Sequence, residues 1–549
     1  MIEKSSYLRY LPPVLWENEP PAPGFSLGAA LRIFEKILTG IADDVTIQHG
    51  DHTHEPITGS VARLHQLFDP WQTPQSFLPW LASWVALEFP TLQGRPLWDE
   101  YQRRKVTSEI AQIYRLRGLK AGLNQYLDLY AVGQTRPRVA LDDGSRLLVT
   151  SPTPGQIAPV TALVSQGPVV SGSTVLVEGL VRPWCVAAGP AGSLFVGDTG
   201  VPVSVPLPLK SRVWRISAAG HYDLAGTPPK PQPLAPDTLP LTQVVALTVR
   251  PAQAGQPETL YILDRPGKLY ALPAPYTGTP AALVTSLAVG NTTLWPVAMS
   301  LDTNGDLLIL DRGDGPGTPN PPKIITVRPN PLGVTRKPLQ KVIEPLSLLV
   351  QRDGKLIVGD GREQEPAQPA QRAGNLVRVD RSDPANWTET ALLPTPNPLV
   401  APTAVTRSDD THLYVLDAGL KPFAPPITDP FVLTVAEPAS VYRVDLGSNP
   451  PTVTRVTQLG HLVFPTGMAA DGGRLLICDP GQPEVAGLTP VWSRLLPFRF
   501  GVVVHFADAR LPPDPDARTT VQRQVIGNIR SIVEQQKPAH TLWNLITAI

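Results

Sequence analysis

The pattern Leu307-Leu-Ile-Leu-Asp311, a short apolar run that ends in an aspartate, decides the fold because it recurs along the chain. Each copy has a leucine, three mostly apolar residues and then the aspartate. The six copies are Leu194-Phe-Val-Gly-Asp198, Leu260-Tyr-Ile-Leu-Asp264, Leu307-Leu-Ile-Leu-Asp311, Leu356-Ile-Val-Gly-Asp360, Leu413-Tyr-Val-Leu-Asp417 and Leu475-Leu-Ile-Cys-Asp479. Apolar runs of this length, bounded by Gly, Pro and Asp, are typical of short strands buried on both faces.

The repeat extends on both sides of this run. A proline lies 15 residues before the aspartate in four units and 14 before it in a fifth, while the second unit lacks it: Pro183, Pro296, Pro345, Pro402 and Pro465. Another apolar segment follows each aspartate. These segments are residues 212–216, 268–272, 323–327, 375–379, 440–444 and 492–496. Each unit therefore supplies at least three strands.

The spacing between successive aspartates identifies the architecture. It is 66, 47, 49, 57 and 62 residues, and repeats of roughly 40 to 50 residues with several strands are typical of propeller blades. We therefore predict a six-bladed β-propeller over residues 181–496. The repeat resembles the six-bladed class that includes NHL-repeat and gluconolactonase-like propellers. Pro-rich loops after the aspartates are expected on one face, as a contact surface or as spacers.

The regions outside the propeller have a different periodicity. Residues 1–140 read as helical, because apolar residues recur three and four apart from Leu31 to Ile41 and again from Val106 through Leu129. Residues 141–180 read as a linker with first strands. Residues 497–549 read as a strand followed by a helix that Pro538 ends. The predicted fold class is multidomain α+β, in which the segment 497–549 completes the helical N-terminal region.

Three segments carry a family resemblance. The first is Phe68-Asp-Pro-Trp followed by Phe77-Leu-Pro-Trp-Leu-Ala-Ser-Trp84. The second is Trp98-Asp-Glu-Tyr-Gln-Arg-Arg-Lys105 running into Tyr114-Arg-Leu-Arg-Gly-Leu-Lys-Ala-Gly122, and the third is Gln536-Lys-Pro-Ala-His-Thr541. In this order they resemble the phage tail protein I family, the wedge subunit of contractile-tail baseplates and of extracellular contractile injection systems. The propeller is then an insertion between the two parts of a discontinuous wedge domain.

The resemblance implies a structural protein, with protein–protein assembly around a tail axis as its function. It implies about six copies per particle, and contacts with the larger wedge subunit, the inner baseplate or spike hub, and sheath-proximal proteins. The chain is then cytoplasmic during assembly and later part of a phage-tail-like particle. The propeller is expected to serve as a peripheral binding or spacer module. We expect no enzymatic activity, no catalytic residue and no cofactor.

Aromatic and basic residues in the three segments are the candidate interface. Trp80 and Trp84 stand four apart and share one face of a helix, where the alternative interpretation is ordinary core packing. The basic residues suit ion pairing with another wedge protein. The full candidate set is Trp80, Trp84, Trp98, Arg103, Arg104, Arg115, Arg117, Lys537, His540 and Trp543.

Composition excludes several other functions. Lys plus Arg and Asp plus Glu both number 47 in the 549 residues, so no net field attracts nucleic acid or an anionic membrane. No apolar stretch approaches the roughly 18 residues that span a bilayer. The two cysteines, Cys185 and Cys478, lie in neither a metal-type nor a redox-type spacing. The 65 prolines favour short strands and turns over long helices.

Four clusters invite a chemical interpretation. The six blade aspartates could line a channel and hold a divalent ion, which makes a lactonase-like metal hydrolase the alternative function. Such aspartates more often accept backbone N–H bonds in the following turn. The His49–Glu55 cluster could hold zinc but lacks a finger spacing, and Asp302-Thr-Asn-Gly-Asp306 resembles a calcium loop without its closing Glu. The basic run Arg103–Lys105 lacks a recognition-helix pattern. We predict no metal site.

Overall fold

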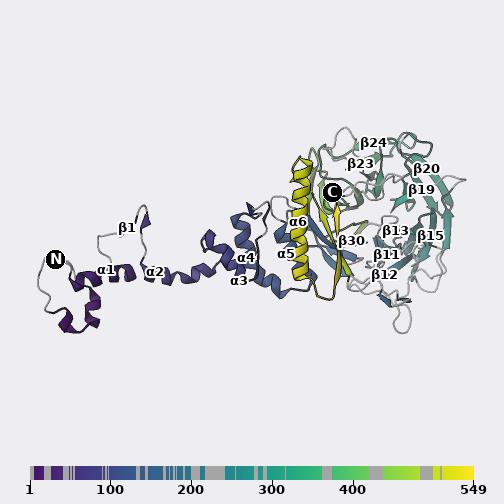
Figure 1. Cartoon of the computed structure of the whole chain (residues 1–549). Coiled ribbons are helices and arrows are strands. Elements are labelled where there is room, and N and C mark those ends of the chain that lie inside the picture. Colours follow the sequence, from purple (N-terminus) through teal and green to yellow (C-terminus); the bar gives the residue numbers. More distant parts are fainter. Residues whose placement is uncertain are drawn as a thin grey trace. The chain divides into compact units, whose positions relative to one another are not determined.

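The computed structural model has two compact units, Met1–Arg117 and Gly118–Ile549 (Figure 1). Its description covers the whole chain except residues 1–4, 18–25, 41–47, 50–51, 54–55, 90, 93–94, 97, 132–136, 143–145, 165–168, 172–173, 177–179, 181, 190–191, 200–210, 217–240, 254, 277–281, 289–293, 316, 362–373, 420–436, 482–498, 507–509 and 549. Among the described residues, no helix has the length and apolar character needed to cross a bilayer.

The first unit is mainly helical, as predicted. Local sequence sets its helix boundaries: Ser26 caps α1 by accepting a hydrogen bond from Ala29 N–H, and Asp99 forms a capping box with Gln102 at the start of α4. The elements are η1 (Ser6–Tyr10), η2 (Pro13–Leu15), α1 (Leu27–Thr39), β1 (Gln48–His49), β2 (His52–Thr53), α2 (Ile57–Ala62), η3 (Leu64–Phe68), η4 (Gln75–Phe77), α3 (Leu78–Trp84), β3 (Thr91–Leu92), β4 (Arg95–Pro96) and α4 (Glu100–Arg115).

The helical pattern predicted from Val106 through Leu129 is two helices. Helix α4 ends at Arg115, and α5 spans Lys120–Tyr130. Gly118 lies between them with φ of 84°, a left-handed conformation that side chains disfavour and that ends a helix.

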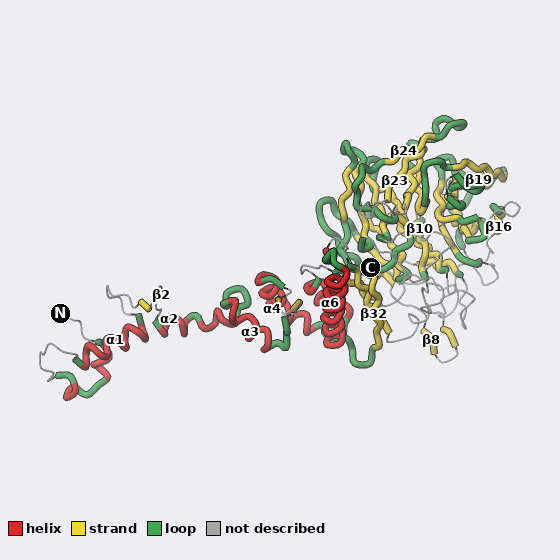
Figure 2. Tube along the Cα trace, turned by 45° about the horizontal axis from the view of Figure 1, so that its top comes forward, coloured by secondary structure: helices red, strands yellow, loops and turns green. Residues whose placement is uncertain are grey.

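A small α/β domain belongs to the second unit. Its sheet has the order β32-β31-β5, formed by Leu542–Ala548, Arg499–His505 and Arg138–Asp142. Strand β32 is labelled in Figure 2. Strand β31 runs parallel to β32 and antiparallel to β5. Parallel neighbours need a long crossover, which helix α6 (Pro515–Gln536) provides. As predicted, α6 buries one apolar stripe, Val521, Val525, Ile529, Ile532 and Val533. Helix α5 packs against α6 and β5.

The propeller consists of six antiparallel sheets, which we call blades 1 to 6 in chain order (Figure 1). Blade 1 is β10 (Pro183–Ala188), β11 (Leu194–Asp198) and β12 (Arg212–Ile216); blade 2 is β13 (Val244–Arg250), β14 (Thr259–Asp264), β15 (Lys268–Pro273) and β16 (Ala282–Ser286); blade 3 is β17 (Pro296–Leu301), β18 (Leu307–Asp311), β19 (Lys323–Pro329) and β20 (Leu332–Pro338). Blade 4 is β21 (Pro345–Val350), β22 (Leu356–Gly361), β23 (Gly374–Asp380) and β24 (Thr388–Ala391); blade 5 is β25 (Pro402–Arg407), β26 (His412–Asp417), β27 (Ser440–Asp445) and β28 (Thr452–Arg455). The first strands of neighbouring blades contact one another around a closed ring, including β10 with β29 of blade 6.

Blade 6 draws its strands from two distant parts of the chain. Its order is β29-β30-β6-β7, in which β29 (Gly467–Asp471) and β30 (Arg474–Asp479) are joined by β6 (Arg146–Thr150) and β7 (Thr161–Val164). The propeller therefore begins at Arg146, and the boundary expected at residue 181 has to be corrected. The third strand of blade 6 is β6, and the segment expected in that place, 492–496, lies outside the described residues. The hairpin β8 (Val169–Ser171) and β9 (Thr174–Leu176) follows β7.

The recurring proline marks a bulge. In blades 1, 3, 4 and 5 the register of the first strand slips directly after this proline, and in blade 2 it slips after Val244, which takes the same position. Proline has no N–H to give to a ladder, so a bulge at a strand start tolerates it. This geometry explains why the second unit can lack the proline.

Core packing lies between the blades. Each of the six pairs of adjacent blades shares one cluster of buried apolar residues. The cluster between blades 6 and 1 contains Leu147 and Leu476 from one side and Leu194 and Trp214 from the other. The Asp-ended strands are second in their sheets, and each is buried from its leucine to its aspartate, which agrees with their continuous apolar runs.

Candidate functional site

The six blade aspartates have a structural role within their own blades. All are at most 2% exposed, and each accepts one or more bonds of 2.6–3.1 Å from backbone N–H groups that precede the first strand of its own blade. The donors are Arg182 for Asp198, Thr242 and Gln243 for Asp264, Trp295 for Asp311, Ile343 and Glu344 for Asp360, Val400 and Ala401 for Asp417, and Val463 and Phe464 for Asp479.

Among the described residues, Asp417 and Asp479 also accept an N–H from the turn that follows, from Gly419 at 2.7 Å and from Gly481 at 3.0 Å. Burial raises the pKa of Asp417 to about 6, against the opposing effect of its backbone donors. Within the described residues, no group of three or more His, Cys, Asp or Glu side chains is placed to hold a metal ion.

The calcium-like turn is occupied by a cation of the protein itself. Asp302 accepts two bonds from the guanidinium of Arg381, which also donates from Nε to the carbonyl of Gly354 at 2.6 Å. Asp306 N–H donates to the side chain of Asn304 at 2.9 Å. The sequence Asp302–Asp306 therefore forms a hairpin turn, and Arg381 ties this turn of blade 3 to blade 4.

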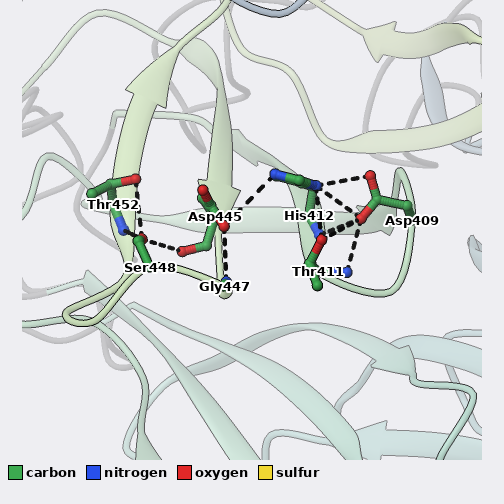
Figure 3. A network of polar contacts seen from close by, with 7 residues as sticks. All are labelled: Asp409, Thr411, His412, Asp445, Gly447, Ser448 and Thr452. Atoms are coloured by element: carbon green, nitrogen blue, oxygen red, sulfur yellow. Dashed lines mark hydrogen bonds and ion pairs between the residues drawn. The ribbon is translucent and has the colours of Figure 1, made fainter.

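The one histidine–carboxylate network drawn in Figure 3 also belongs to turns. His412 Nδ1 lies 2.8 Å from Asp409, and its Nε2 lies 3.7 Å from Asp445. Ser448 contacts Thr452 and the Asp445 carbonyl instead of the imidazole. These residues therefore join two hairpins of blade 5. Nucleophilic catalysis needs a nucleophile that is hydrogen-bonded to a base, which is in turn oriented by a third group, and these residues are not arranged in that way. Of the other histidine cluster, His54 and Glu55 lie outside the described residues.

An aromatic cluster in the first unit includes two of the predicted interface residues. The ring centroids of Trp80 and Trp84 lie 4.5 Å apart; the Phe68 ring packs against both, and the Phe77 ring packs against Trp80. Trp80 is 40% exposed and Trp84 is 62% exposed. Trp98 is only 2% exposed, so the structure places it in the core and corrects its assignment to a surface.

The four candidate arginines have different environments. Arg104 is enclosed: it pairs with Glu100 and donates to the carbonyls of Pro70 at 2.7 Å and Thr73 at 2.8 Å. Its role is to fix the preceding loop to α4, which removes it from an exposed interface. Arg103 donates from Nε to the Asp99 carbonyl at 3.3 Å. Arg115 and Arg117 are exposed.

The C-terminal candidates are held by the α/β domain. Lys537 donates to the Thr541 carbonyl at 3.2 Å and pairs with Glu534 at 3.4 Å. Trp543 donates from its indole to Glu534 at 2.6 Å and stacks on Phe500, with ring centroids 6.4 Å apart. His540 is exposed.

Two of the three segments singled out in the sequence meet in this domain. Gly118 N–H, from the second segment, donates to the carbonyl of Gln536 at 2.9 Å, from the third. A pocket opens beside this bond and takes its lining from both segments and from the sheet: Gly118, Leu119, Lys120, Leu123, Leu141, Phe500, Gln536, Lys537, Pro538 and Thr541. Sequence reasoning missed Leu119, Gln536 and Phe500 as site residues. The first two lie within the quoted segments, which was the available signal.

Comparison with known families addresses the N-terminal region. Residues 48–137 match the profile of the phage tail protein family Tail_P2_I. This stretch is a phage tail protein domain. The match covers the first two of the segments that carried the resemblance, and it supports a structural role in a phage tail. No curated protein matches the chain.

Solved structures match the propeller. They include a gluconolactonase of Xanthomonas campestris, with 12% identity and a TM-score of 0.35 over 60% of this chain and 97% of that one. A candidate gluconolactonase has 12% identity and a TM-score of 0.34 over 58% and 93% of the two chains. These matches contradict the expectation that the chain is not an enzyme, because both proteins are described as enzymes, and we withdraw it. Similarity at this level assigns no activity to this chain.

Proposed function

We propose that the chain is a wedge subunit in the baseplate of a contractile phage tail or a related injection system. The observation that carries this proposal is the match of residues 48–137 to a phage tail protein family. The wedge position, a stoichiometry of about six copies, and contacts with the larger wedge subunit, the hub and sheath-proximal proteins extend that match.

The arrangement of the second unit is consistent with such a role. The α/β domain combines α5 and β5 with β31, α6 and β32, while the propeller is inserted between β5 and β31. Asp142, the last residue of β5, lies so close to Gly481 that a Cβ on this glycine would fall 2.5 Å from its Oδ1. Entry and exit of the insertion are therefore adjacent, as a peripheral module requires.

Purified particles provide the test. We expect the chain to co-purify with tail tube and sheath proteins on a density gradient, at about six copies per particle when measured by quantitative mass spectrometry against a spiked standard. Deleting its gene should leave particles without an assembled baseplate. A chain found only in the soluble fraction, with tails unaffected by the deletion, would contradict the proposal.

A further inference from the structure

The pocket beside Gln536 has the size of a single side chain. Its volume is about 200 Å³, larger than the roughly 150 Å³ apolar cavity that admits benzene. Leu119, Leu123 and Phe500 supply apolar lining, and Leu119 is 57% exposed at its mouth. One aromatic or branched aliphatic side chain fits this space, and burying it there would remove apolar surface from water on both partners.

Gln536, one of the residues that line the pocket, carries a buried acceptor. Gln536 is only 2% exposed, and within the described part of the chain its Oε1 has no hydrogen-bond donor. Leaving a buried amide oxygen unpaired is unfavourable. Its environment is therefore incomplete in the chain alone, and an N–H group carried by an occupant of the pocket would complete it.

The charges around the pocket restrict the chemistry of its occupant. The lining contains two cations, Lys120 and Lys537, and no acidic residue, although Lys537 also pairs with Glu534 outside the lining. Helix α5 begins at the pocket with Leu119 at its N-cap, without a side-chain cap and without an acidic residue in its first turn. A helix N-terminus favours a negative charge, because its backbone N–H groups and its dipole both point to it.

We infer that this pocket receives a segment of a second tail protein in which an aromatic or branched aliphatic side chain stands next to an aspartate or glutamate. The apolar side chain enters between Leu119 and Phe500, a backbone N–H donates to Gln536 Oε1, and the carboxylate faces the start of α5. The inference rests on the proposed function, since it names the chemistry of a neighbour in the particle.

The test uses full-length variants and their incorporation into purified particles. Gln536→Met should raise the denaturant midpoint of the free chain, because the unpaired acceptor is gone, while lowering incorporation by about fivefold. Gln535→Met is the matched control, because Gln535 is exposed and bonds only Ser531 among the contacts seen. Leu119→Asp should lower incorporation by about tenfold or more, whereas Leu283→Asp, at a propeller leucine that is 55% exposed, should not.

A photocrosslinker at position 119 in assembled particles identifies the occupant. A crosslink to another tail protein, at an apolar residue beside Asp or Glu, supports the inference. A crosslink to a basic segment or to a second copy of this chain overturns it. So does unchanged incorporation of Gln536→Met and Leu119→Asp, or a lowered midpoint for Gln536→Met, which would make the residue structural. Absence of the wild-type chain from particles would contradict the proposed function itself, and this result is distinguishable from a failure of the inference about the pocket.

Discussion

Arg146 Nη2 lies 2.5 Å from Asp479 Oδ2, and the two side chains are 4% and 0% exposed although 333 residues separate them. They pair across β6 and β30, where the strand that enters the propeller meets the strand that leaves it. Asp479 also accepts the backbone N–H groups of Val463 and Phe464. This ion pair therefore closes the ring with charges that water cannot reach.

Breaking the pair should be costly. Arg146→Met leaves the Asp479 carboxylate buried without its cation, and we expect a loss of about 3 to 5 kcal/mol in the free energy of unfolding. Urea titration followed by tryptophan fluorescence measures it. Arg352→Met is the control, because its pair with Asp410 is 69% and 61% exposed and should contribute less than about 1 kcal/mol. Equal effects of the two variants would show that the Arg146–Asp479 ion pair contributes no more to stability than an exposed pair.

The propeller should be removable when it is cut at its structural ends. Replacing residues 146–481 with a short Gly/Ser linker is expected to leave α5, β5, β31, α6 and β32 folded, because Asp142 and Gly481 are adjacent. Circular dichroism and a cooperative thermal transition would verify it. A variant in which the same linker replaces residues 181–496 should aggregate, because it keeps β6 and β7 but loses β29 and β30, which complete their sheet. Equal behaviour of both deletions would refute the boundary at Arg146.

Burial of Asp417 predicts that the stability of the protein falls as the pH rises. Burial raises its pKa from 3.8 to about 6, so its contribution to stability is fully present below about pH 4 and is lost as pH rises through 6. The stability of the wild type relative to Asp417→Asn should therefore fall by about 3 kcal/mol between pH 4 and pH 7. Denaturant midpoints of both proteins across this range test it; a constant difference would contradict the raised pKa.

The two cysteines should resist alkylation in the native protein. Both are free thiols, Cys478 fully buried and Cys185 half-buried, and burial raises the pKa of each. Because the thiolate is the reactive form, iodoacetamide at pH 8 should label them far more slowly than in urea, Cys185 before Cys478. Mass spectrometry of timed samples gives both rates. Native rates equal to those in urea would place the thiols at the surface.

The tryptophans of the first unit should separate into two classes. Trp98→Ala is expected to cost about 3 to 5 kcal/mol of stability, because the side chain is almost fully buried. Trp84→Ala, at 62% exposure, should leave the stability of the free chain within about 1 kcal/mol and reduce particle incorporation. If Trp84→Ala destabilises the chain as strongly as Trp98→Ala, its aromatic cluster is core.

The sequence by itself determined what depends on local pattern. The six Asp-ended strands follow from continuous apolar runs at repeated spacing, and α6 follows from its stripe at helical periodicity, because both periods are written in neighbouring residues. The tail protein resemblance follows likewise from contiguous segments. The sequence also predicted Trp98 and Arg104 at an interface, and this was wrong. The identity of an aromatic or basic residue does not show whether its side chain is buried or exposed.

Only the tertiary structure decided which distant residues meet. Strands β6 and β7, from the start of the insertion, complete blade 6 beside β29 and β30 from its end, and this pairing closes the ring. Leu119 and Gln536 line one pocket because β5 and β31 bring the two parts of the α/β domain together around the propeller. Side-chain periodicity carries no information about such pairings, since they are set by packing between segments more than 300 residues apart.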